Sequence, residues 1–169
     1  TTPNTITLTK DGAAYEIANN SYSNITVESD GSFWISSSVG YAATHFSANG
    51  AYIGELGPEE QGTDMKLFNY NGAEYAAIST YLCTSNTSIS EGAVTIVEKG
   101  SGSVVGTFPS AGLGSTRNTS FRNSVCAEAT TDGYYVWINV PFQGVACFKY
   151  TEPKEEGDNT ETPKEEEEE

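Results

Sequence analysis

Residues 63–80 read TDMKLFNYNGAEYAAIST, and this stretch decides the fold. Apolar and polar residues alternate up to Tyr70, the dipeptide Asn71-Gly72 follows, and a second strand-like run begins at Glu74. An Asn-Gly or Asp-Gly dipeptide between two such runs is the strongest short-range hairpin signal, because a type I′ turn requires positive φ at both central residues. The stretch therefore predicts two antiparallel strands joined by a tight turn.

The same signal recurs along the chain, at Asp11-Gly12, Asp30-Gly31, Asn49-Gly50 and Asp132-Gly133. Thr, Ser, Val, Ile, Tyr and Phe dominate between these turns, and helix signals are nearly absent. The strands we expect are 5–8, 14–17, 24–28, 32–36, 43–47, 51–56, 65–70, 74–80, 93–98, 104–108, 125–129, 134–140 and 145–150. This pattern predicts an all-β antiparallel meander of consecutive hairpins.

The hairpins group into about three units, each resembling a propeller blade of four strands in roughly 40–50 residues. The turns of the second and third units, at Gly72 and Gly133, lie farther apart in the sequence than those of the first and second. Insertions rich in Ser, Thr, Asn and Gly, at 83–91 and 110–123, account for the extra length. The third unit is one strand short, and we expect residues 5–8 to pair with residues 145–150 and complete it. A β-sandwich or barrel is the alternative, because three units do not close an ordinary propeller.

Charge divides the chain into two parts. Residues 151–169 contain ten acidic residues and two lysines, so they carry −8 of the formal net charge of −15 and leave −7 for residues 1–150. We expect an all-β domain over 1–150 and a disordered acidic tail over 151–169, since the tail has no aliphatic or aromatic residue to bury. Negative charge on both parts argues against nucleic acid as a partner. No apolar stretch is long enough to predict membrane insertion.

Cysteine and histidine usage gives no metal or cofactor site. Cys83, Cys126 and Cys147 lack Cys-x-x-Cys spacing, and His45 is the single histidine. Buried free thiols are one interpretation of the cysteines, and a disulfide between Cys126 and Cys147 is the other.

No catalytic residue can be assigned from the sequence. His45 has no Gly-x-Ser-x-Gly nucleophile motif to serve. Glu59, Glu60 and Asp64 fall in an expected loop and lack the calcium-loop pattern. Carboxylates that meet only in the folded chain, as in a glycoside hydrolase, stay open.

Aromatic residues supply the candidates for binding. Trp34 and Trp137 each occupy the strand after an Asp-Gly turn, which favours matching core positions. Four tyrosines lie nearer the turns, where an amphipathic ring suits a ligand or an interface, and they are the weak ligand-binding candidates: Tyr22, Tyr41, Tyr52 and Tyr70.

Four segments carry a resemblance to a known group: DGSFWISSS, THFSANGAYIGELG, TDMKLFNYNGAEYAAISTY and TTDGYYVWINVPFQGVACFKY. Residues 24–150 resemble the terminal blades of uncharacterised secreted β-propeller-like proteins from gut Bacteroides-type bacteria. The resemblance implies a secreted or cell-surface protein and carries over no catalytic residue. We therefore expect an exported, non-enzymatic binding module for a glycan or a protein partner. A glycoside hydrolase-type enzyme fragment and a structural assembly subunit are the alternatives.

Overall fold

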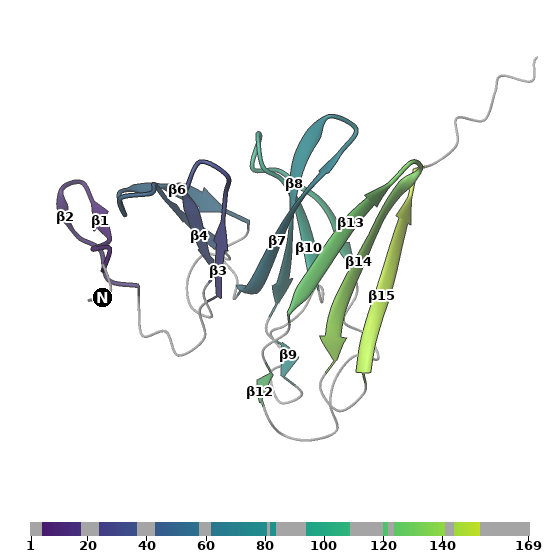
Figure 1. Ribbon diagram of the computed structural model, residues 1–169. Coiled ribbons are helices and arrows are strands. Elements are labelled where there is room, and N and C mark those ends of the chain that lie inside the picture. Colours follow the sequence, from purple (N-terminus) through teal and green to yellow (C-terminus); the bar gives the residue numbers. More distant parts are fainter. Residues whose placement is uncertain are drawn as a thin grey trace, which may run out of the picture.

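A computed structural model describes residues 5–17, 24–36, 43–57, 62–80, 82–83, 94–108, 120–121, 124–140 and 144–152. Within these ranges the chain is all-β, contains no helix, and forms antiparallel hairpins (Figure 1). The expected fold class is therefore confirmed. The three predicted units are three separate sheets, and among the described strands they do not close into a barrel.

The first sheet is a four-stranded meander in chain order. It contains β3 (Asn24–Val27), β4 (Phe33–Ser36), β5 (Ala43–Phe46) and β6 (Tyr52–Leu56). The outer strand of this sheet, β6, is irregular. Its register with β5 shifts by one residue between His45 and Phe46. Every residue of β4 is buried, which shows that both faces of this sheet are covered at its centre.

The second sheet repeats this arrangement. Its order is β7 (Gly62–Tyr70), β8 (Ala73–Thr80), β10 (Val94–Glu98) and β11 (Val104–Phe108). The outer strand is again irregular, because register shifts between Ile96 and Val97 of β10. Between β8 and β10 the chain contributes a short strand, β9 (Leu82–Cys83), which pairs with β12 (Ser120–Phe121). This two-stranded ladder links segments that the sequence predicted to be loops.

The third sheet has three strands, β13 (Val125–Thr130), β14 (Gly133–Val140) and β15 (Gly144–Thr151). Pairing of β14 with β15 is continuous over eight residue pairs, from Gly133–Thr151 to Val140–Gly144. Thr151 thus belongs to the domain rather than to the tail. The remainder of the predicted tail, 153–169, lies outside the described residues.

The second sheet lies between the other two and is buried on both faces (Figure 1). Ala76 and Ile78 pack with Trp34 in a cluster shared with the first sheet. Ala77 lies on the opposite face, in a larger cluster shared with Val136 of the third sheet. Successive residues of β8 therefore pack alternately into the two hydrophobic clusters. This explains why the segment Ala76–Ala77–Ile78 is apolar at every position.

Hydrogen bonds join the first strands of neighbouring sheets. β7 contacts both β3 and β13. The Thr26 hydroxyl of β3 donates to the Met65 carbonyl of β7 at 2.9 Å. The Asp64 carboxylate of β7 accepts from the Val125 N–H of β13 at 3.0 Å and from the Met65 N–H at 2.9 Å. Asp64 is thus a strand residue that ties main chain together, rather than a loop carboxylate.

The expected closure of the third sheet by the N-terminal segment is wrong. Residues 5–8 are not a strand; a small hairpin of β1 (Thr9–Lys10) and β2 (Ala13–Ala14) follows them. This segment lies against the first sheet, where the Thr9 N–H donates to the Gly50 carbonyl at 2.9 Å. A Cβ at Gly50 would meet the Thr7 carbonyl oxygen at 2.5 Å, so glycine permits the close approach.

Turn geometry confirms the type I′ prediction at two of the five dipeptides. Asn71 and Gly72 have φ of 49° and 79°. Asp11 and Gly12 also both have positive φ, of 53° and 78°. At Asp30-Gly31 only the glycine has positive φ, and the Gly31 N–H donates to the Glu28 carbonyl. That is a three-residue loop with a glycine bulge, and Asn49-Gly50 repeats it. At Asp132-Gly133 the glycine instead begins β14.

The structure rules out a disulfide between Cys126 and Cys147. Trp137 pairs with Cys126 on one side and with Cys147 on the other, so the two cysteines lie two strands apart. Neighbouring strands are about 4.8 Å apart, which places the two main chains about 10 Å from each other, beyond the ~7 Å that a disulfide spans. Both thiols are free and exposed rather than buried. The side chain of Cys83 lies outside the description.

Replacing Asp64 by alanine should lower the free energy of unfolding by about 1–3 kcal/mol, because the N–H of buried Val125 loses its acceptor. Urea unfolding followed by circular dichroism measures this change. Glu128→Ala is the matched control, since Glu128 is an exposed carboxylate on the neighbouring strand and should change stability by no more than about 0.5 kcal/mol. Equal effects of the two substitutions would contradict a role for Asp64 in joining the sheets.

Candidate functional site

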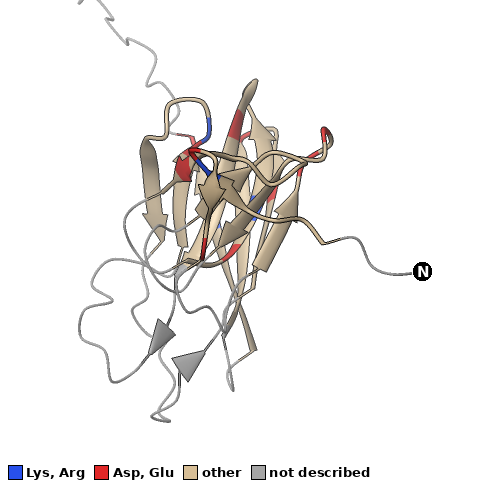
Figure 2. Cartoon of the chain, turned by 90° about the vertical axis from the view of Figure 1, so that its left-hand side faces the viewer, with Lys and Arg blue, Asp and Glu red and all other residues tan. Residues whose placement is uncertain are grey.

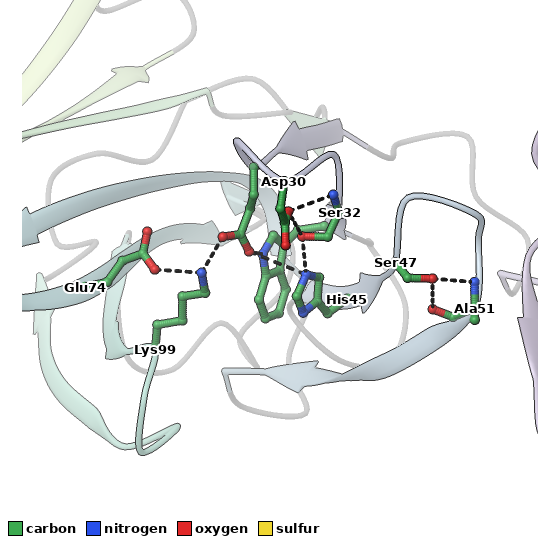
Figure 3. Close-up of polar contacts among 9 residues, drawn as sticks. Asp30, Ser32, His45, Ser47, Ala51, Glu74 and Lys99 are labelled. Carbon is green, nitrogen blue, oxygen red and sulfur yellow. Dashed lines mark hydrogen bonds and ion pairs between the residues drawn. The ribbon is translucent and has the colours of Figure 1, made fainter.

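One polar cluster lies at the turn end of the junction between the first and second sheets (Figure 3). Its centre is Glu28, which follows β3. The Glu28 carboxylate accepts from the Trp34 indole N–H at 2.6 Å and from the Lys99 ammonium at 2.5 Å. Lys99 also donates to Glu74 of the second sheet at 2.6 Å. A single lysine thus bridges carboxylates from two sheets.

The cluster holds its members in defined charge states. Burial opposes ionisation of Glu28, but the hydrogen bonds from Lys99 and Trp34 outweigh it and lower the pKa of that carboxyl. Burial likewise works against the charge on Lys99, yet Glu28 and Glu74 raise its pKa. For His45, burial prevails over the attraction of Glu28 and lowers the pKa below the ordinary 6.5. His45 is therefore neutral at pH 7.

Ser32 and His45 do not form a catalytic pair. The Ser32 hydroxyl donates to the Asp30 carboxylate at 2.6 Å, and its oxygen lies 3.1 Å from Nε2 of His45. The same Nε2 lies 3.4 Å from Glu28, so it faces two oxygen atoms, and this arrangement favours the tautomer with the proton on Nε2. A serine-activating histidine instead presents an unprotonated nitrogen to the hydroxyl and its other nitrogen to the carboxylate. His45 also stacks flat on Trp34, with ring centroids 4.0 Å apart, which fits a packing role.

A second site is a pocket between the second and third sheets. Its volume is about 130 Å³, and strands from both sheets contribute to its wall. The lining residues are Tyr70, Asn71, Tyr75, Val105, Tyr134, Tyr150 and Glu152. Four tyrosines from β7, β8, β14 and β15 therefore converge, and Glu152 directly follows the last strand.

The polar groups of the pocket are unevenly satisfied. The Asn71 amide donates to the Glu152 carboxylate at 2.6 Å. The Tyr70 hydroxyl is buried and has no hydrogen bond of acceptable geometry among the described residues, although Glu152 and Asn71 lie close enough to act on it. Burial and then the nearby Glu152 raise the pKa of Tyr70 to about 12. Burial, followed by the hydroxyls of Tyr150, Tyr75 and Tyr70, raises the pKa of Tyr134 to about 12, so the phenols of Tyr70 and Tyr134 are neutral at pH 7.

The sequence identified one tyrosine of this pocket. Tyr70 was a candidate because it precedes a turn. Tyr134 directly follows Asp132-Gly133 and could have been found by the same signal, whereas Tyr75 and Tyr150 gave none. Tyr52 lies elsewhere, under the Lys10 ammonium, which is 3.9 Å from its ring centroid. Tyr22 and Tyr41 fall outside the described residues, as do Glu59 and Glu60.

The two tryptophans do not share one environment. Trp34 is buried in the core between the first and second sheets, as expected. Trp137 is half-buried and stacks on Tyr135, on the face of the third sheet that points away from the second. The matched positions in the repeats therefore correspond to a core residue in one case and a surface residue in the other.

Acidic positions outnumber basic ones along the described strands and turns (Figure 2). Within that part of the chain, no three His, Cys, Asp or Glu side chains gather in a way that could hold a metal ion. No helix of the described residues is long and apolar enough to cross a membrane. Comparisons of the chain with protein-family models, curated proteins and solved structures found no match. The resemblance to secreted propeller-like proteins thus stays a prediction.

The lowered pKa of His45 predicts a specific loss of stability in mild acid. The unfolded chain takes up a proton near pH 6.5, before the folded chain does, so the free energy of unfolding falls as pH falls below 6.5. Glu28, whose pKa is lowered from 4.5, adds a second loss that begins only near and below pH 4.5. Urea unfolding at half-unit pH steps from 7.5 to 4 resolves the two phases.

His45→Gln is the variant that isolates the first phase, because His45 is the single histidine of the chain. The variant should show a flat free energy of unfolding between pH 7 and 5.5 and keep the acid loss at lower pH. An unchanged slope between pH 7 and 5.5 in this variant would place the titrating group elsewhere.

Proposed function

We propose that this chain is a non-enzymatic binding module whose tyrosine pocket takes the edge of one sugar ring of a glycan. The observation that carries the proposal is the convergence of four tyrosine rings and the Asn71–Glu152 pair on one pocket. Tyr150 and Glu152 are exposed there, so a ligand hydroxyl can reach the polar atoms of both side chains.

The chemistry of the wall favours a neutral sugar. Tyrosine rings offer apolar faces to the C–H groups of a sugar, and their hydroxyl tips offer hydrogen bonds. Glu152 and Asn71 add an acceptor and a donor side by side, and hydrogen bonds to a carboxylate are the stronger kind. The same carboxylate, on a chain of net charge −15, disfavours phosphates and acidic sugars.

Size limits what the pocket takes. A cavity of roughly 150 Å³ holds a benzene-sized molecule. The pocket, at about 130 Å³, therefore has room for the edge of one ring, and the rest of a glycan would lie outside it. Tyr150, which is 37% exposed, lies where it can stack on the part that protrudes.

Binding accounts for the site better than catalysis does. Cleavage of a glycosidic bond requires two carboxyl groups that flank it. Glu152 is the one carboxylate among the described residues that line the pocket. In the other cluster, the Ser32 hydroxyl donates to the Asp30 carboxylate rather than to His45, which does not suit a serine nucleophile. We place the module outside the cell or on its surface, where free glycans and glycoproteins are encountered.

Tyr150→Phe tests the proposal, because its effects on folding and on binding should separate. Tyr150 is 37% exposed, so the loss of its hydroxyl should change the free energy of unfolding by no more than about 0.5 kcal/mol. Affinity for a sugar identified on a glycan array should fall about three- to tenfold, which corresponds to one hydrogen bond of roughly 0.5–1.5 kcal/mol. Isothermal titration calorimetry and urea unfolding measure the two quantities.

Tyr135→Phe is the matched control. Tyr135 lies next to Tyr134 on β14 but points to the opposite face of the sheet, so its hydroxyl should affect neither quantity. An array without hits, together with no binding of monosaccharides at millimolar concentration, would contradict the proposal. So would a sugar whose affinity is unaffected by Tyr150→Phe. A protein ligand whose binding depends on these tyrosines would replace the glycan as partner.

A further inference from the structure

The outer edge of the third sheet differs from the outer edges of the other two. The first and second sheets each have four strands, and their outer strands carry a register shift that disrupts regular pairing. The third sheet has three strands, and its outer strand β15 pairs with β14 without interruption (Figure 1). Bulges are one way in which proteins prevent edge strands from pairing with other chains, and β15 lacks one.

The register shows which main-chain groups β15 presents. Thr130 and Gly133 are the paired residues that close the two-residue turn between β13 and β14. At the other end of the same two strands, the Asn139 N–H donates to the Ser124 carbonyl. Odd-numbered residues of β14 therefore bond to β13, and even-numbered ones bond to β15. Their partners on β15 are also even-numbered. The N–H and C=O groups of Val145, Cys147 and Lys149 consequently point away from the sheet.

We propose that β15 pairs antiparallel with β15 of a second copy of this chain, about a two-fold axis at Cys147. The two three-stranded sheets then form one continuous six-stranded sheet. In this register Phe148 lies opposite Ala146 of the second copy, and Tyr150 lies opposite Gly144, so each large side chain meets a small residue. A two-fold interface has to be self-complementary in this way.

The charges of the strand fit the same register. Lys149 is the single charged residue of β15, and it lies opposite Val145 of the second copy. Val145 is 71% exposed, and the aliphatic stem of the lysine would cover it. The two Lys149 residues are then four residue steps apart, roughly 14 Å, which exceeds the Debye length of about 8 Å at physiological salt. The pairing therefore places no like charges opposite each other.

Substitutions at Val145 test this register, because its side chain is exposed in the single chain and contributes little to folding. Val145→Glu places a carboxylate opposite Lys149 of the second copy, twice per dimer, and should tighten association roughly fivefold; Val145→Lys should weaken it by a similar factor. Nonspecific association of a chain with net charge −15 would respond in the opposite direction, since added positive charge would reduce repulsion.

Sedimentation velocity of the full chain over a wide concentration range measures these dimer constants. High concentrations are needed, since one strand pair buries less area than a standard interface. Cysteine crosslinking with copper phenanthroline gives a second readout, because residues opposite each other in this register have Cα atoms about 5.5 Å apart, within disulfide reach. Cys147→Ser should abolish the crosslinked dimer, whereas Cys126→Ser, an exposed thiol two strands inward, should not.

A chain that stays monomeric throughout the series overturns the proposal. So does a crosslink that survives Cys147→Ser, or a dimer that Val145→Glu weakens and Val145→Lys tightens. None of these outcomes depends on the ligand of the tyrosine pocket.

Discussion

Burial of the second sheet on both faces is the constraint on which the rest of the structure depends. A β-strand exposes successive side chains to opposite faces, so a sheet covered on both sides needs apolar residues at nearly every position. The segment Ala76–Ala77–Ile78 meets this need by assigning alternate residues to the two clusters. Each flanking sheet buries its facing side chains against this central layer. The polar cluster and the tyrosine pocket both lie where such a sheet-to-sheet junction reaches the surface.

Local features of the fold were predictable from the sequence, and features between distant segments were not. Asn-Gly and Asp-Gly dipeptides fix where hairpins lie, because their backbone preference acts over four residues. The same dipeptides did not distinguish a two-residue turn from the bulged loop at Gly31, since that depends on how the flanking strands pair. The position of residues 5–9 depends on contacts with Gly50, some forty residues away, which no local pattern encodes.

The tyrosine pocket shows the same limit at the level of a site. Its walls come from five strands, from the turn residue Asn71 and from Glu152, which composition alone assigned to the acidic tail. Only proximity to a turn had singled out Tyr70; Tyr134, which follows Asp132-Gly133, also meets that criterion, but Tyr75 and Tyr150 do not. A pattern of period two does assign Tyr134, Val136 and Ile138 to one face, but it does not say which neighbouring sheet that face meets.

Comparison of the two main carboxylates separates a structural site from a binding site. Glu28 is surrounded by donors, with an indole N–H and an ammonium in contact and an imidazole beside them, so its hydrogen-bonding capacity serves the junction between two sheets. Glu152 has one amide donor, from Asn71, and no cation within ion-pair distance among the described residues. Glu152 is exposed and lines the tyrosine pocket. The hydrogen-bonding capacity of Glu28 is therefore taken up by protein groups, whereas the carboxylate of Glu152 can accept further hydrogen bonds. That difference is why we assign ligand binding to the tyrosine pocket.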